Sequence, residues 1–290
     1  MNYDEMLAML TDLNNSQHIA LHTVPHCSNL ITQLNKRIPT KQAFFERILP
    51  IYVATRTVVF DIDDIAGYVN EVVAKVNQYM NLFWPHSRNP FVHQADFTSS
   101  IVPEMLCLLF WHIISHSGLT LEVSAQKDLA IECIFEISGG GAIRFKNKRV
   151  DVAVTKPCSL VFEGQNAEFP IPLMAIECKT NLDKNMISGI EHSVNELKKT
   201  FPECRYYVIT EASDFNVNLN YASSGIDEIY ILRQQKRATI RRNPALRNPL
   251  NSELIIDIAN ALAASIANME TELISLNTRM QSGKLIGRNV

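Results

Sequence analysis

The sequence predicts an α/β protein in which a mixed sheet is flanked by helices and preceded by a mainly helical N-terminal region. Up to about residue 87, apolar residues recur mostly at helical spacing. After Gly118, short β-rich runs are separated by Gly and Pro and then alternate with helices. The chain has 290 residues, of which 47% are hydrophobic and 20% charged, so it can bury a large core. This composition excludes a disordered or collagen-like protein.

The N-terminal region is expected to contain several helices. Residues 44–49 predict a helix that ends at Pro50, because proline disrupts the interior of a helix. Residues 65–76 place apolar side chains on one stripe behind Asp64, which is a suitable N-cap.

A joint is expected at residues 85–90, which begin and end with proline and are polar between. We therefore expect two domains, a helical N-terminal region at 1–95 and a second domain at 96–290.

The second domain should begin with a buried helix. This helix starts near Thr98 with Ser99 or Ser100 as its cap, has Pro103 in its first turn, and carries Glu104 into an apolar run. Strand-like runs follow at residues 130–137, 149–154, 159–162 and 173–179. A helix at 183–200, strands at 205–210 and 228–232, and a terminal helix at 253–276 complete the pattern.

The sequence favours a cytoplasmic protein without membrane contact. The first twenty residues include Asp4 and Glu5 and lack the basic and apolar blocks of a secretory signal. The longest apolar stretch, at 105–114, is shorter than the roughly 20 residues that span a bilayer, so it is interpreted as a core helix. The cysteines are scattered without a CxxC pair, which indicates reduced thiols.

The basic residues are unevenly distributed along a chain whose net charge is −3. Residues 229–252 contain no acidic residue and hold Arg233, Lys236, Arg237, Arg241, Arg242 and Arg247. A second cluster directly precedes Asp151 and consists of Arg144, Lys146, Lys148 and Arg149. Such stretches can bind the phosphates of a polyanion, although a solvated loop would have the same composition.

Asp151, Glu177 and Lys179 are the candidate catalytic residues. Side chains at i and i+2 of a strand share a face, so Glu177 and Lys179 should project together while Cys178 points into the core. The chain between residues 154 and 175 is long enough for a hairpin that brings Asp151 alongside them. The alternative is a surface salt bridge between Glu177 and Lys179.

These residue types suit the hydrolysis of a phosphodiester. Two carboxylates, from Asp151 and Glu177, can bind a hard divalent cation, for which we expect Mg²⁺. The metal would polarise a phosphoryl oxygen and acidify a bound water, while Lys179 would orient the nucleophile or stabilise developing charge. Glu104 is a candidate further ligand. Phosphates of the substrate would be held by Lys146, Lys148 and Arg149.

Three other groups of residues are weaker candidates for a functional site. His18, His22, His26 and Cys27 are spaced like zinc ligands, but Pro25 interrupts them, so we interpret them as surface or core residues. His112 and His116 lack the glutamate of an HExxH motif and are expected to pack in the core helix. Residues 139–141 are a glycine run without the Lys of a phosphate loop.

The Asp and Glu-x-Lys arrangement resembles the PD-(D/E)xK nuclease superfamily, with Val150 in place of its proline. The longer segments 175–186, 226–233 and 283–288 resemble subunits of the BbvCI-like restriction endonucleases. Residues 100–106 are similar to the segment of that family that bears a helix glutamate. The resemblance covers roughly residues 98–288.

The resemblance implies a Type II restriction endonuclease subunit with a PD-(D/E)xK catalytic domain at 96–290. It implies Mg²⁺-dependent cleavage of one strand of double-stranded DNA, next to a second, non-identical subunit that cuts the other strand of an asymmetric site. The implied catalytic residues are Asp151, Glu177, Lys179 and Glu104, of which Asp151, Glu177 and Glu104 are the metal ligands. The region 1–95 would serve DNA recognition or subunit contact.

Candidate DNA-binding residues are Lys146, Lys148, Arg149, Arg233, Arg237, Arg241 and Arg242. Two alternatives remain open at this point: a non-catalytic DNA-binding or assembly subunit, and a related repair or nicking nuclease.

Overall fold

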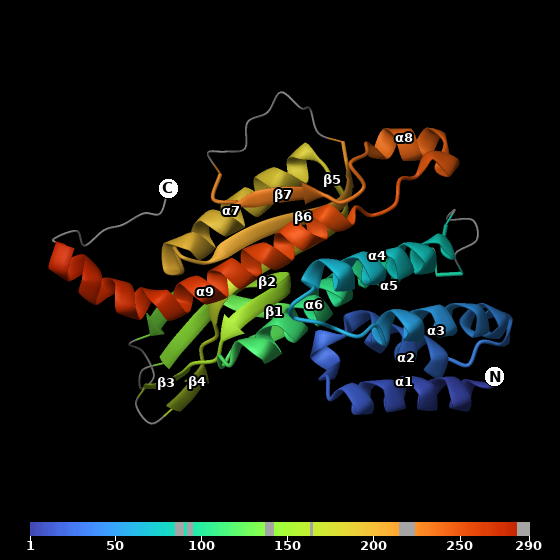
Figure 1. Cartoon of the computed structure of the whole chain (residues 1–290), viewed down its shortest axis with the longest axis horizontal. Helices are drawn as coiled ribbons and strands as arrows, with labels where there is room; N and C mark the ends of the chain where they lie inside the picture. Colours follow the sequence, from blue (N-terminus) through green and yellow to red (C-terminus); the bar gives the residue numbers. More distant parts are fainter. Residues whose placement is uncertain (85–89, 92–94, 137–141, 163–164, 215–223, 283–290) are drawn as a thin grey trace.

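The computed structural model describes the chain except residues 85–89, 92–94, 137–141, 163–164, 215–223 and 283–290. Its N-terminal region is helical, as predicted (Figure 1). The helices are α1 (Tyr3–Gln17), α2 (Pro25–Asn35), α3 (Gln42–Arg56) and α4 (Ile65–Asn81), with short 3-10 turns η1 (Leu21–Thr23) and η2 (Pro39–Lys41). Residues 85–89 of the predicted joint at 85–90, the glycine run at 139–141 and the segment 283–288 lie outside the described residues.

A five-stranded mixed sheet forms the second half, with the order β1-β2-β5-β6-β7. β1, β2 and β5 are antiparallel, whereas β5, β6 and β7 are parallel. The strands are β1 (Glu122–Glu136), β2 (Ala142–Lys156), β5 (Ile171–Leu182), β6 (Arg205–Ser213) and β7 (Glu228–Ile231). A separate hairpin of β3 (Ser159–Phe162) and β4 (Gln165–Glu168) connects β2 to β5. The predicted α/β class with a mixed sheet is confirmed.

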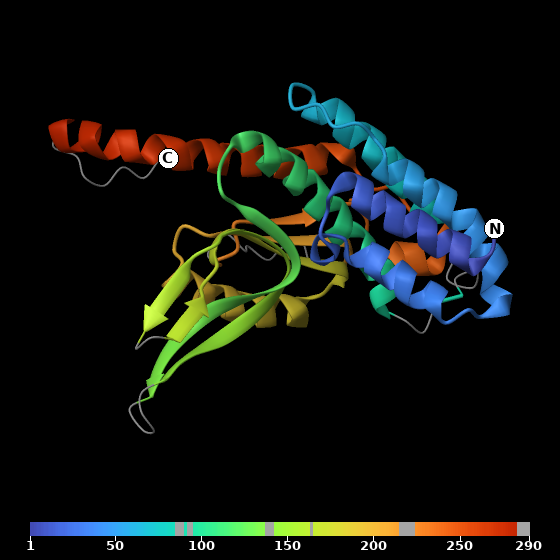
Figure 2. The same cartoon turned by 90° about the horizontal axis from the view of Figure 1, so that it is seen from below.

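Helices cover both faces of this sheet (Figure 2). α7 (Lys184–Thr200) links β5 to β6 and packs on one face, where Ala153 and Ala175 belong to its hydrophobic cluster. The other face carries α6 (Ile101–Ser117), preceded by the short α5 (Ala95–Ser99), and α9 (Ser252–Ser282). Val152 and Ile176 point to that side. Between β7 and α9 lie α8 (Arg237–Arg242) and the 3-10 turn η4 (Pro244–Leu246).

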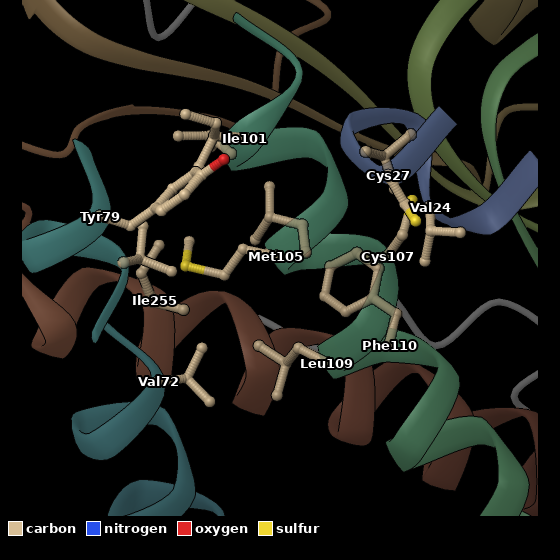
Figure 3. Close-up of a cluster of buried hydrophobic side chains, with 14 of the residues drawn as sticks. Val24, Cys27, Val72, Tyr79, Ile101, Met105, Cys107, Leu109, Phe110 and Ile255 are labelled. Atoms are coloured by element: carbon tan, nitrogen blue, oxygen red, sulfur yellow. The ribbon is translucent and has the colours of Figure 1, made fainter. Parts of the chain in front are cut away.

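The larger hydrophobic cluster joins the N-terminal helices to α6 and α9. Figure 3 shows Cys27 of α2, Tyr79 of α4, Phe110 of α6 and Ile255 of α9 in one buried group. Each of these side chains is at most 2% exposed. The regions 1–95 and 96–290 therefore share one core, and the division between them stays a prediction.

Helix α6 is the buried core helix that the sequence predicted. It begins after the N-cap Ser100, has Pro103 in its first turn and ends at the left-handed Gly118. Residues 97–117 are the one described stretch long and apolar enough to span a membrane, and 72% of its apolar window is buried inside the fold. The helix thus supplies core to both the sheet and the N-terminal helices.

The prediction that Pro50 ends a helix is wrong, because α3 continues through it to Arg56. Leu49 before the proline and Tyr52 after it are both buried, and Pro50 itself is exposed. Burial of the apolar stripe on both sides of Pro50 thus outweighs the loss of one backbone hydrogen bond, which costs about 3 kcal/mol or more for an interior proline.

Candidate catalytic cleft

Asp151 lies beside the Glu-x-Lys segment, as the sequence predicted. β2 pairs with β5 up to Val152 and Ile176, which brings the next residues of both strands together. Asp151 Oδ2 accepts a hydrogen bond of 2.7 Å from the backbone N–H of Cys178, between Glu177 and Lys179. The hairpin between β2 and β5 therefore produces the expected cluster.

Lys179 connects the two carboxylates. Its Nζ lies 2.9 Å from Glu177 Oε1 and 3.8 Å from Asp151 Oδ2. Glu177 Oε2 is 3.3 Å from Lys148 Nζ and accepts a hydrogen bond of 3.2 Å from the Tyr206 hydroxyl. Glu177 is only 8% exposed, so this ion pair is not the solvated surface salt bridge that was the alternative interpretation.

The cluster keeps its charges because its members compensate one another. Burial alone would raise the pKa of Glu177, but the ammonium groups of Lys179 and Lys148 outweigh it and lower that pKa. Burial would lower the pKa of Lys179, but Glu177 and Asp151 raise it. Asp151 differs, since burial raises its pKa despite the Cys178 N–H and Lys179. Of the two carboxylates, Asp151 is therefore the one whose ionised form an additional cation would stabilise more.

A cleft of about 730 Å³ opens in front of Asp151 and Lys179. One wall is the sheet, with Gln126, Cys178 and Thr180 next to the two charged residues. The opposite wall comes from η1, α2 and the start of α6 and contains Leu21, His22, Pro25, Ser28, Asn29, Ser99, Ser100 and Pro103. The sequence carried no motif that marked the N-terminal wall.

Glu104 does not join the cluster. Pro103 lines the cleft, but consecutive helical residues point about 100° apart, and Glu104 faces the N-terminal helices instead. Its carboxylate accepts hydrogen bonds from the Tyr52 hydroxyl at 2.6 Å and the Cys27 N–H at 2.8 Å, and lies 3.8 Å from Arg56. Within the described part of the chain, Glu104 makes no hydrogen bond or ion pair with Asp151, Glu177 or Lys179. The expectation that Glu104 is a metal ligand is therefore not supported by its position.

The basic residues before Asp151 differ in their surroundings. Lys148 belongs to the cluster through Glu177. Lys146 lies 3.4 Å from Glu132, and Arg149 makes a two-bond contact with Asp128 at 2.8 and 2.9 Å. The Lys146 and Arg149 side chains are more than half exposed, so phosphates can compete for them.

Arg233 is not available to DNA, contrary to expectation. It is 2% exposed, and its guanidinium donates to Glu211 at 2.8 Å and to the carbonyl of Asn248. Arg247 lies 2.9 Å from the same carboxylate and stacks over Trp84. These arginines fix the chain after β7. Arg241 and Arg242 of α8 are exposed and Arg237 is partly so, while buried Ile240 anchors the helix.

Two of the histidines that the sequence singled out, His26 and His112, pack against structural partners. His26 is 1% exposed and contacts the Phe97 carbonyl and the Tyr79 hydroxyl, which confirms a core histidine. His112 stacks on Phe60 with ring centroids 4.7 Å apart, as expected for packing. Among the described residues, no group of three His, Cys, Asp or Glu side chains is arranged to hold a metal ion.

The family model described as Bpu10I restriction endonuclease matches residues 101–250, from α6 to the start of α9. The chain belongs to the Bpu10I restriction endonuclease family. The matched region contains Asp151, Glu177 and Lys179.

A solved structure supports the fold. The chain resembles the native BbvCI A2B2 tetramer solved at low resolution, with a TM-score of 0.68 and 24% sequence identity over 85% of this chain and 96% of that one. No match was found among curated proteins. The resemblance to BbvCI-like enzymes, expected from the sequence, is confirmed.

The side chains of this family member suit a divalent cation. Mg²⁺ typically uses one or two protein carboxylates and completes its shell with waters and substrate phosphates. Asp151 and Glu177 supply that number, and Asp151 lines the cleft. The raised pKa of Asp151 also indicates a carboxylate that further positive charge would stabilise.

Proposed function

We propose that this chain is a catalytic subunit of a Type II restriction endonuclease that hydrolyses phosphodiester bonds at a specific site in double-stranded DNA, one strand per subunit. The observation that carries the proposal is the meeting of Asp151, Glu177 and Lys179 from two adjacent strands, with Asp151 and Lys179 lining a cleft. Membership of a restriction endonuclease family supports the substrate class.

Each residue of the cluster has a distinct role. Asp151 and Glu177 hold Mg²⁺, which supplies charge stabilisation to the phosphoryl group and lowers the pKa of water when bound. Lys179 presents a positive charge beside the scissile phosphate, where it stabilises charge that develops in the transition state. Glu177 keeps Lys179 ionised and oriented through their 2.9 Å contact. The Cys178 N–H and Gln126 fix the Asp151 carboxylate.

The surrounding basic residues bind the DNA backbone. Lys148 lies next to the cluster, and Lys146 and Arg149 exchange their carboxylate partners for phosphates on binding. The α8 arginines Arg237, which is partly exposed, and Arg241 and Arg242, which are exposed, contact the duplex farther from the cleft, as phosphate or base contacts. The protein acts in the cytoplasm, where cellular DNA is accessible.

A second subunit is required because a duplex cut needs two active sites. We propose that this partner is a non-identical nuclease subunit. The BbvCI assembly of two kinds of chain, A2B2, supports a mixed complex for this fold. The partner's identity is tested by co-expression with the product of the neighbouring open reading frame.

The test is cleavage of a supercoiled plasmid by the purified chain, alone and with the neighbouring gene product, in Mg²⁺ and in EDTA. We expect nicking or linearisation at one sequence in Mg²⁺ only. Asp151→Asn should remove cutting of one strand while leaving DNA binding within about twofold, because catalysis is lost without the phosphate contacts. If the complex cuts both strands equally well with Asp151→Asn, the chain is an assembly subunit rather than a nuclease.

A further inference from the structure

Gln126 has a backbone conformation that is unusual for its place in a strand. It lies in β1 with φ of 53°, a left-handed value uncommon for residues other than glycine. The pairs Ala125 with Val152 and Lys127 with Val150 flank it, so Gln126 lies directly opposite Asp151 in the register. The ladder lacks a pair at these two positions, although the register of the flanking pairs is unchanged.

At this point, the side-chain alternation of both strands shifts from one face of the sheet to the other. In a regular strand, side chains two residues apart share a face. Val150 nevertheless belongs to the hydrophobic cluster beneath α7, whereas Val152 belongs to the cluster on the α6 side. In β1, Ala125 packs on the α6 side and Leu129 on the α7 side, although they too are an even number of residues apart. The left-handed turn at Gln126 accounts for this switch.

The switch determines where the Asp151 carboxylate lies. The Asp151 side chain points into neither hydrophobic cluster. It lies beside β5, where Oδ2 accepts the hydrogen bond from the Cys178 N–H. The Gln126 side chain returns to the same group, with Nε2 donating a hydrogen bond of 2.8 Å to Asp151 Oδ1. Gln126 also lines the cleft. One residue thus shapes the backbone beneath Asp151 and holds its second oxygen.

We propose that Gln126 is a positioning residue that prearranges Asp151 for a divalent cation. Its backbone directs Asp151 into the cleft, and its amide restricts rotation of the carboxylate, while each Asp151 oxygen keeps a lone pair for the ion. The inference rests on the proposed function, since it concerns the same metal site. Backbone strain retained next to a reactive group is a recognised sign of such a role.

Two variants separate the side chain from the backbone. Gln126→Met keeps the length of the side chain and removes the donor, whereas Gln126→Gly also relieves the left-handed backbone. Gln234→Gly is the matched control, because Gln234 has φ of 48° but lies in the turn after β7, outside the cleft. Asp151→Asn defines the binding that depends on this site.

The readouts are Mn²⁺ binding followed by electron paramagnetic resonance, and the melting temperature of the intact protein without metal. We expect Gln126→Met and Gln126→Gly to weaken the Asp151-dependent Mn²⁺ binding about tenfold, the usual effect of removing a group that orients a ligand. The melting temperature should be unchanged for Gln126→Met and equal or higher for Gln126→Gly. Gln234→Gly should leave Mn²⁺ binding unchanged.

Each other result overturns the inference. If Gln126→Met binds Mn²⁺ like the wild type while Asp151→Asn does not, Gln126 has no positioning role and the proposed metal site stands. If binding falls only together with the melting temperature in both Gln126 variants, the residue is merely structural. If Asp151→Asn binds Mn²⁺ like the wild type, the proposed function itself is wrong and this inference fails with it.

Discussion

The Tyr52 hydroxyl donates a hydrogen bond of 2.6 Å to Glu104, and this contact joins α3 to the first turn of α6. Arg56 lies one turn beyond Tyr52, donates to the Tyr52 hydroxyl and is 3.8 Å from the same carboxylate. Burial raises the pKa of Glu104, and Arg56 opposes that shift. Glu104 thus belongs to a buried polar network between the N-terminal helices and α6.

Removing Glu104 should therefore destabilise the fold rather than weaken metal binding. Arg56 is 4% exposed and would keep a buried charge without its carboxylate, so we expect Glu104→Ala to lower the unfolding free energy by about 3–5 kcal/mol. Urea denaturation measures this. Glu71→Ala, which removes an exposed pair with Lys75, should change stability by less than about 1 kcal/mol. Loss of Mn²⁺ binding by folded Glu104→Ala would contradict the structural role.

His26 should make the protein less stable in acid. Burial lowers its pKa to about 3 from the ordinary 6.5. The Phe97 carbonyl can only accept, so His26 Nδ1 carries the proton, and neutral Nε2 accepts a hydrogen bond from the Tyr79 hydroxyl that a second proton would break. The folded state therefore favours neutral His26, and stability present above pH 6.5 is lost as the pH falls toward 3, by up to about 1.4 kcal/mol per pH unit.

Urea unfolding at pH 7, 6 and 5 measures this effect, with His26→Gln as the reference. The variant loses the titrating group, so its stability should fall less steeply with decreasing pH. Parallel curves for the two proteins would refute the assignment of this pH dependence to His26.

Lys179 should be necessary for strand cutting. Lys179→Ala removes a positive charge at the cleft, and we expect nicking to slow by about a hundredfold or more. The matched control is Lys199→Ala, since Lys199 pairs with Glu196 on the exposed side of α7. Single-turnover plasmid nicking compares the two variants. Equal rates for Lys179→Ala and the wild type would exclude a role in the reaction.

The α8 arginines and Arg233 should affect DNA binding differently. Arg241→Ala combined with Arg242→Ala should make the plot of log affinity against log salt about 1.8 units less steep, because each phosphate contact contributes about 0.9. Arg233→Ala should leave that slope unchanged and lower the melting temperature, since it removes one of the two guanidinium groups that neutralise the Glu211 carboxylate. Fluorescence anisotropy at several salt concentrations measures the slope, and a reduced slope for Arg233→Ala would reverse its assignment as structural.

The sequence pattern was enough to predict most of the fold and the central cluster. Alternation along β5 placed Glu177 and Lys179 on one face, and the hairpin length brought Asp151 beside them. Helical spacing likewise predicted α7 nearly to its ends and α4 from its start, although α4 continues beyond residue 76 to Asn81. These features depend on the local spacing of apolar and polar residues, which can be read from a single sequence.

The direction in which an individual side chain points depends on packing between segments that are distant in sequence, and local sequence patterns do not reveal this packing. Glu104 turned away from the cleft because α3 offered Tyr52 and Arg56. Arg233 is buried because β6 provides Glu211, distant in sequence. The left-handed Gln126 had no signal at all, since glutamine is not a residue typical of that conformation.

The N-terminal wall of the cleft has a consequence for protein engineering. His22, Ser28 and Asn29 line the same cleft as Asp151 and Lys179, and they come from helices whose interior is shared with α6. These helices are therefore not an exchangeable module that can be swapped between relatives to change the DNA site. A functional chimera would have to transfer α6 together with these helices, because the same helices form one wall of the cleft and part of the hydrophobic core.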